Sequence, residues 1–179
     1  MIAATPPDPH LSGAQGPATV WYLHDRYKPR GGVTVSYDPS VPEGNGRTYD
    51  LPGGAQMVLS PAQDPGSFLH ELGHAFDDES MTDAARAKWL QIMRQARLWG
   101  NAGAAHTGYP NPPREQFAET YRVITQHPQA LKSKRAWQHY LDTGGVSYFP
   151  GREPTLQQMR RIRRLLADVS AGKYGTPVT

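Results

Sequence analysis

One short stretch of the sequence holds the residue types that metal-assisted hydrolysis requires, His70-Glu71-Leu72-Gly73-His74. On an α-helix, positions i and i+4 lie on one face, one turn apart, so His70 and His74 can direct their imidazoles at one metal ion. Glu71 stands next to the first histidine and can reach a water molecule on that metal. Two nitrogen ligands beside a carboxylate general base are typical of zinc peptidases.

The residues around this motif favour a buried helix. Asp64 and Pro65 precede it, and they suit an N-cap and the first helical position. Unpaired polar groups on a buried helix cost several kcal/mol, so the histidines and the glutamate need partners. A surface helix with two inert histidines is the alternative that this context disfavours. The neighbouring side chains are apolar: Phe68, Leu69, Leu72, Ala75 and Phe76.

The composition is that of one globular domain. The chain has 179 residues, 37% of them hydrophobic, and its 18 glycines and 17 prolines indicate many loops. No apolar run approaches the roughly 18 residues of a membrane span. Residues 1–16 lack the apolar core of a signal peptide and read as a flexible arm, and the compartment stays undecided. Without cysteine, any metal must be held by His, Asp or Glu.

We expect an α+β fold, with a small N-terminal sheet packed on the motif helix and a mainly helical C-terminal half. Residues 17–60 contain β-type runs at 19–24, 33–37 and 56–60, which predict a mixed or antiparallel sheet. Residues 38–49 hold prolines and glycines and are predicted to form a long loop. In zinc peptidases generally, the edge strand of such a sheet pairs with extended substrate.

Four further helices are predicted after the motif helix. The first starts at the capping-box-like pair Ser80 and Asp83 and ends at Gly100–Gly103. The next is opened by prolines 112 and 113 and ends at His127-Pro128. A third covers about 129–142, and the last covers 155–170. We expect residues 17–150 to form the main domain and residues 151–179 to pack on it.

The C-terminal segment carries the positive charge of the chain. The net charge is +3, and residues 151–179 alone hold six basic and two acidic residues. Their amphipathic helix could dock on nucleic acid, an anionic surface or an acidic partner. The simpler interpretation is an apolar face packed on the body with arginines in water. We therefore expect no nucleic-acid partner, and we expect a monomer.

A catalytic zinc ion takes three protein ligands and one water, so a third ligand is needed. The position six residues after the second histidine is Ser80, which removes one common arrangement. Asp77 is better placed to accept a hydrogen bond from a ligand imidazole or to tether the helix. His106 lies in a glycine-rich loop, whereas Glu115 and Glu119 stand one turn apart on the predicted helix after residue 112. Spacing alone leaves these candidates open.

Two motifs together resemble a known family. The runs His-Glu-Leu-Gly-His-Ala-Phe-Asp and Glu-Gln-Phe-Ala-Glu are similar to those of the anthrax-lethal-factor-like metallopeptidases, which include the Pro-Pro endopeptidases. The resemblance covers residues 68–121, and it implies a zincin-like, gluzincin-like fold. It implies Glu115, 41 positions after His74, as the third zinc ligand, with Glu119 behind the ligands. It also implies that Tyr109 aims its hydroxyl at the oxyanion, although its spacing to Glu115 is one residue shorter than in the family; the alternative is a packed loop aromatic.

The resulting hypothesis is a zinc-dependent metalloendopeptidase acting on a peptide or protein substrate. Zn2+ on His70, His74 and Glu115 would activate a water, Glu71 would take its proton, and Tyr109 would stabilise the oxyanion. A rival family is the ImmA/IrrE type of repressor peptidase, which shares His-Glu-Leu-Gly-His but has its second glutamate sooner. A different class is a non-catalytic metal-binding scaffold that docks through its basic C-terminal helix.

Overall fold

The computed structural model describes residues 27–43, 45–52, 54–61, 65–95, 99, 112–143 and 153–177. Within these ranges the chain is α+β, with a three-stranded sheet and five α-helices. None of the described helices has the length and apolarity needed to cross a membrane. Several predictions lie outside the described residues: the arm at 1–16, the strand at 19–24, the N-cap Asp64, Gly100–Gly103, His106 and Tyr109.

The sheet is mixed, and one of its strands was predicted to be a loop. β1 (Val33–Tyr37) pairs in parallel with β3 (Gly54–Leu59), and β2 (Gly46–Leu51) pairs antiparallel with the other side of β3. The prediction of a loop over 38–49 is therefore wrong from residue 46 onward. Every residue of β2 is exposed or half-buried, so no hydrophobic alternation reveals it. Its pairing with β3 specifies this strand.

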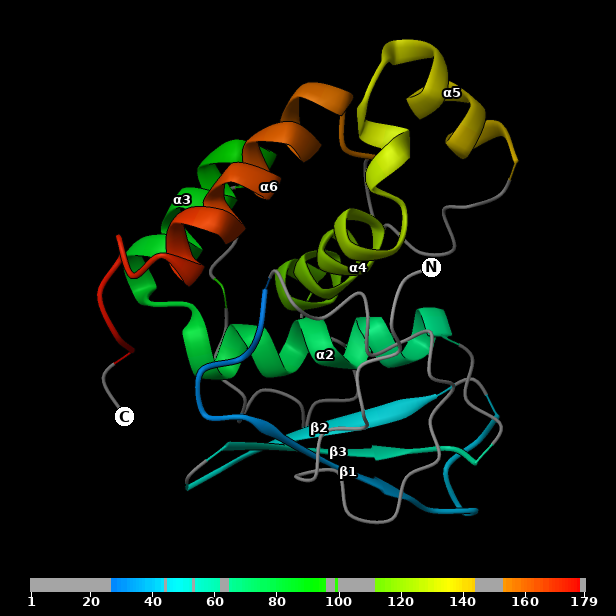
Figure 1. Ribbon diagram of the computed structural model, residues 1–179, viewed down its shortest axis with the longest axis vertical. Helices are drawn as coiled ribbons and strands as arrows, with labels where there is room; N and C mark the ends of the chain where they lie inside the picture. Colours follow the sequence, from blue (N-terminus) through cyan, green and yellow to red (C-terminus); the bar gives the residue numbers. More distant parts are fainter. Residues whose placement is uncertain are drawn as a thin grey trace, which may run out of the picture.

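The helix α2 (Pro65–Ser80) covers one face of the sheet (Figure 1). Alternate residues of β3 are buried, Ala55, Met57 and Leu59, and this apolar side of the sheet faces the helix. The helix starts at Pro65, as predicted, because proline suits the first helical turn. The motif helix is thus held between a sheet on one side and the remaining helices on the other.

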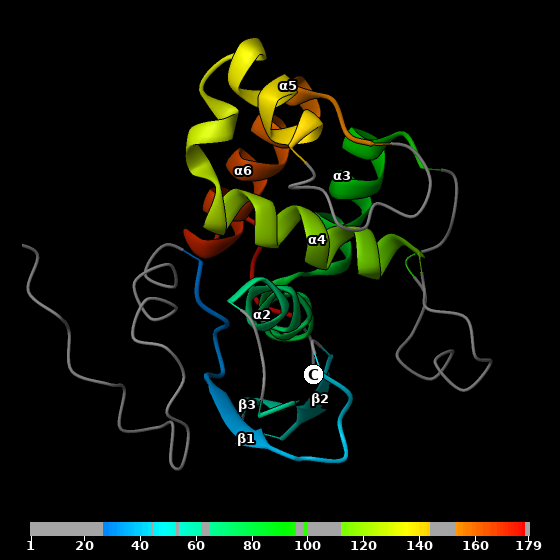
Figure 2. The same cartoon turned by 90° about the vertical axis from the view of Figure 1, so that its right-hand side faces the viewer.

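The helix α4 (Pro112–Gln126) packs on the side of α2 away from the sheet. In Figure 2, α2 is seen end-on while α4 runs across the view, so the two helices cross steeply. Their backbones meet at Gly73, where an added Cβ would lie only 2.7 Å from the Cα of Ala118. Because both residues are small, side chains beside the crossing can bridge the two helices.

The helix α3 (Asp83–Met93) is shorter than predicted at both ends. Ser80 ends α2, and the N-cap of α3 is Thr82, whose hydroxyl accepts a hydrogen bond from a backbone N–H. The helix stops where Arg94 adopts a left-handed conformation with φ 57°, well before residue 100. The apolar spacing that predicted a longer helix reaches Trp99, which packs on core aromatic rings from non-helical backbone.

The single helix predicted over 129–142 is two helices. Pro128–Leu131 form the 3-10 helix η3, and α5 (Lys134–Asp142) begins again after Ser133. The Ser133 hydroxyl accepts a hydrogen bond from the N–H of Ala136 at 3.1 Å. A serine competes for local hydrogen bonds in this way, which favours a new helix start over a continuous helix.

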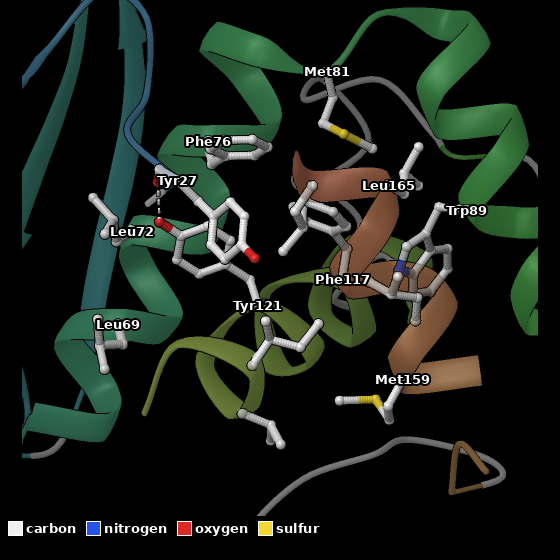
Figure 3. Close-up of a cluster of buried hydrophobic side chains, with 14 of the residues drawn as sticks. Tyr27, Leu69, Leu72, Phe76, Met81, Trp89, Phe117, Tyr121, Met159 and Leu165 are labelled. Atoms are coloured by element: carbon white, nitrogen blue, oxygen red, sulfur yellow. Dashed lines mark hydrogen bonds between the residues drawn. The ribbon is translucent and has the colours of Figure 1, made fainter. Parts of the chain in front are cut away.

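The last helix, α6 (Leu156–Ser170), lies where it was predicted. Thr155 and Gln158 form a capping box at its start. Its apolar face packs on α3 and α4, and Figure 3 shows Leu165 in one cluster with Trp89 and Phe117. The buried residues of this face are Met159, Ile162, Leu165, Leu166 and Val169.

A buried hydrogen bond ties α4 to the chain before the sheet. The hydroxyl of Tyr121 donates to the carbonyl oxygen of Tyr27 at 2.5 Å (Figure 3). Burial raises the pKa of Tyr121 far above its usual value, so the hydroxyl remains a protonated donor. The same ring packs on Phe76 of α2, with 5.4 Å between ring centroids. The position of α4 is therefore fixed by packing as well as by the polar residues described next.

Candidate metal centre

His70, His74 and Glu115 converge between α2 and α4. The Nε2 atom of His70 lies 3.2 Å from Oε2 of Glu115, and the Nε2 atom of His74 lies 3.5 Å from Oε1 of Glu115. One ligand atom from each residue falls within 4.8 Å of the others. Two imidazole nitrogens and one carboxylate oxygen suit a divalent transition metal, zinc among them. The structure thus brings together the three residues predicted as ligands, as a group that could hold a metal ion.

The electrostatics of this group fit a cation. Burial opposes the charged form of His70, but hydrogen bonds to Glu115 and Glu119 and the nearby negative charges outweigh it and raise its pKa to about 9. Burial likewise opposes ionisation of Glu115, yet hydrogen bonds to both histidines hold the pKa of this carboxyl well below its usual range. Positive charge is therefore favoured between the imidazoles and the carboxylate.

Glu119, one turn after Glu115, has a different environment. Its Oε2 atom lies 3.6 Å from Nδ1 of His70, on the side of the ring away from Glu115. Arg122 donates to both of its oxygens, at 2.9 Å from Nε and 2.5 Å from Nη2. Burial opposes its ionisation, but His70 and Arg122 lower its pKa. A carboxylate behind a ligand imidazole fixes the orientation of the ring, so the geometry favours Glu115 as ligand and Glu119 as support.

Asp77 tethers the helices, which is one of the two roles predicted for it. Its Oδ1 atom accepts from Nε of Arg86 at 2.8 Å, and its Oδ2 atom accepts from Nε1 of Trp99 at 3.1 Å. The Nε atom of Arg114 lies 3.0 Å from the same Oδ2 atom. One carboxylate that is 1% exposed therefore connects α2 to α3, to α4 and to the segment at residue 99.

Glu71 faces the sheet. The hydroxyl of Thr48 in β2 lies 2.7 Å from Oε2 of Glu71 and 3.0 Å from its backbone carbonyl oxygen. At Gly46, two residues earlier on the same face of β2, an added Cβ would lie 2.4 Å from Cγ of Glu71. The edge of the sheet therefore contacts the predicted general base, while Glu115 of α4 contacts the two histidines that are predicted as metal ligands.

Several residues around the site were not predicted from the sequence. Thr48 and Gly46 fall in the stretch predicted as a loop, and no local pattern marks them. Arg122 stands three positions after Glu119, a spacing that favours helical ion pairs and could have indicated it. Arg114 forms ion pairs with Asp78 and Asp77, which lie 36 and 37 positions earlier in the chain, and at that separation the sequence spacing carries no information. Tyr109 and His106 lie outside the described residues, and their proposed roles remain predictions.

No protein-family model matches the chain, and no curated protein or solved structure does so either. The family resemblance therefore remains a prediction from the two motifs. The structure itself shows an α+β arrangement with a mixed sheet on one side of the motif helix, and a three-residue group that could hold a metal ion.

Proposed function

We propose that the protein is a zinc-dependent metalloendopeptidase with a zincin-like fold. The observation that carries the proposal is the convergence of both Nε2 atoms of His70 and His74 on the carboxylate of Glu115. Glu115 lies on another helix, 41 positions after His74, so the local sequence around the motif does not by itself bring these residues into contact. Glu71 stands in the proposed role of general base.

A bound metal would supply one part of the chemistry, and side chains of the protein would supply the rest. A zinc ion in this site would act as a Lewis acid and would bring the pKa of a bound water down to about 7. The carboxylate of Glu71 would accept a proton and pass it to the leaving amine. The Thr48 hydroxyl holds that carboxylate in one orientation. Tyr109 would donate a hydrogen bond to the oxyanion, the role that the family resemblance implies.

The sheet offers a binding edge for an extended peptide. β2 pairs with β3 on one side, and no strand of the described residues pairs with its other side. Unpaired backbone groups of an edge strand can accept an added strand, with side chains alternating between two faces. Because Thr48 of this strand contacts Glu71, a peptide along β2 would lie beside the proposed base. The substrate is therefore proposed to be an extended peptide segment.

The first experiment measures metal content. Elemental analysis of protein purified without chelators should find about one zinc per chain in the wild type and none in Glu115→Ala. The wild type and Glu71→Gln are then compared on a peptide library. The variant should keep zinc and lose hydrolysis, because an amide cannot take the proton. A wild type that binds no zinc after reconstitution would refute the proposal, and hydrolysis retained by Glu71→Gln would remove Glu71 as the base.

Thr48→Val tests the orientation of the base. It removes the hydroxyl but keeps a branched side chain in the strand. Loss of a hydrogen bond to a charged group, about 1.5–3 kcal/mol, should lower the turnover number roughly 10- to 100-fold with zinc content unchanged. The matched control is Thr48→Ser, which retains the hydroxyl and should restore most of the rate. Equal rates in the valine variant and the wild type would show that Thr48 has no such role.

A further inference from the structure

A stripe of polar residues runs along α2 on the side that faces α4. His70, His74, Asp77 and Asp78 occupy positions i, i+4, i+7 and i+8, which lie on one face of a helix. We call these four residues the polar stripe. Its N-terminal half is made of imidazoles and its C-terminal half of carboxylates. The rest of the helix is mainly buried and apolar, so water does not solvate the polar stripe fully. The stripe therefore requires partners of opposite charge on the neighbouring helix.

The first turn of α4 meets the polar stripe with two adjacent residues of opposite charge. Glu115 lies against the histidines, as described above. Arg114 lies against the carboxylates: its Nη2 atom donates to Oδ1 of Asp78 at 2.6 Å, and its Nε atom is 3.0 Å from Oδ2 of Asp77. The three side chains are 15%, 12% and 1% exposed, so these contacts are largely shielded from water.

This pairing allows one orientation of α4 and opposes another. Consecutive helical side chains leave the axis about 100° apart, so placing Arg114 also fixes the direction of Glu115. If the turn rotated or slid, Glu115 would approach the carboxylates of Asp77 and Asp78, and like charges at short range repel. The polar stripe therefore selects a register in which the glutamate reaches the histidines.

Asp77 is itself held from a second direction. Arg86 of α3 donates from Nε to Oδ1 of Asp77 at 2.8 Å and from Nη2 to its backbone oxygen at 3.0 Å. Arg86 and Arg114 thus share one carboxylate from two different helices. Only Arg114 is adjacent in sequence to Glu115. This difference provides a matched control, since both arginines contribute to stability through Asp77.

We propose that Arg114 is a positioning residue of the metal centre. Its ion pairs with Asp77 and Asp78 set the orientation of the first turn of α4, and Glu115 is thereby held between His70 and His74. The inference rests on the metal site of the proposed function and does not depend on peptidase activity.

The affinity of the full chain for zinc, measured by competition with a chromogenic chelator, tests this role. Arg114→Met keeps the length of the side chain and removes its charge. It should weaken zinc binding roughly 10- to 100-fold, the effect of removing an outer residue that orients a ligand. Arg86→Met should leave the zinc affinity unchanged. Arg114→Lys retains the charge without the two-point contact and should fall between the wild type and Arg114→Met. A folded Arg114→Met that binds zinc like the wild type, or an equal loss in Arg86→Met, would overturn the inference.

A second measurement needs no metal. Thermal unfolding is followed with chelator present for Arg114→Met, Glu115→Gln and the double variant. If Arg114 positions Glu115, the fall in Tm of the double variant is smaller than the sum of the single falls, whereas Arg86→Met with Glu115→Gln is additive. Additive falls for both pairs would overturn the inference. If the wild type binds no zinc, the proposed function fails, and this cycle still decides whether Arg114 positions Glu115 between the two histidines.

Discussion

Two helices of equal length treat their charges differently. α4 and α6 each have 15 residues, and both are amphipathic. α4 buries charged groups: Glu119 is 2% exposed and Arg122 is 9% exposed. α6 buries only apolar side chains, and Arg160 at its surface donates to the carbonyl oxygen of Leu131 at 2.9 Å. Buried charge is costly unless it is paired, so its presence needs a reason.

That reason is visible in what the two helices contact. The buried charges of α4 lie where it crosses α2, beside the candidate metal centre. The arginines of α6 surround an apolar face that packs on α3 and α4. The comparison shows that the buried charges of α4 lie at the candidate metal centre, whereas the arginines of α6 flank an apolar face that packs on other helices. Removal of charge should therefore matter on α4 and be tolerated on α6.

The largest effect is expected from the two glutamates of α4. Glu115→Gln should abolish stoichiometric zinc binding, because a neutral amide replaces the third ligand. Glu119→Gln should lower the zinc affinity only roughly 10- to 100-fold, because it changes the group behind His70. Isothermal titration of both variants with zinc checks this. If Glu119→Gln proved the more damaging change, the ligand assignment would move to Glu119.

Next in size is the loss of a buried partner. Arg122→Met removes the guanidinium group that donates to both oxygens of the buried Glu119 carboxylate, and the free energy of unfolding should fall by about 3–5 kcal/mol. On α6, Arg161→Met changes an exposed residue and should stay within about 0.5 kcal/mol of the wild type. Urea unfolding of the metal-free proteins provides both values. Similar losses in the two variants would erase the distinction between the helices.

A smaller loss is expected at the helix crossing. Gly73→Ala improves helix propensity, but its Cβ would lie 2.7 Å from the Cα of Ala118, so α4 must shift. Such overpacking should cost about 1–3 kcal/mol of stability and should weaken zinc binding as Glu115 moves away. Thermal unfolding and zinc titration of the same variant check both effects. A more stable protein with unchanged zinc affinity would show that the contact between Gly73 and Ala118 can accommodate a methyl group.

The elements that the sequence predicted well are those with local signals. α2, α4 and α6 combine helical periodicity with a proline or a capping box at the start, and β3 alternates buried and half-buried residues. His70 and His74 could be predicted as metal ligands because two histidines at i and i+4 lie on one face of a helix.

The remaining features depend on what lies opposite in space. β2 has no buried residue, so its identity as a strand comes from β3. The end of α3 follows from the left-handed Arg94, although the apolar spacing continues to Trp99. Thr48 meets Glu71, and Arg114 meets Asp78, only because a sheet edge and a second helix pack against α2. No local spacing encodes such meetings.

The smallest effect is expected on α6, and it tests the comparison most directly. Replacing the exposed Arg161 and Arg164 with glutamine removes two charges from the basic segment and leaves the apolar face intact. Zinc affinity, peptide hydrolysis and Tm should all match the wild type, since the effects of surface substitutions on stability rarely exceed about 0.5 kcal/mol.

Binding of the same proteins to duplex DNA is measured in parallel at low and high salt, because phosphate contacts weaken as salt rises. Wild-type binding that is sensitive to salt and lost in the double variant would mean that α6 docks on a polyanion. In that case the charges of α6 would serve binding, as those of α4 are proposed to do, and the two helices would differ only in what they bind.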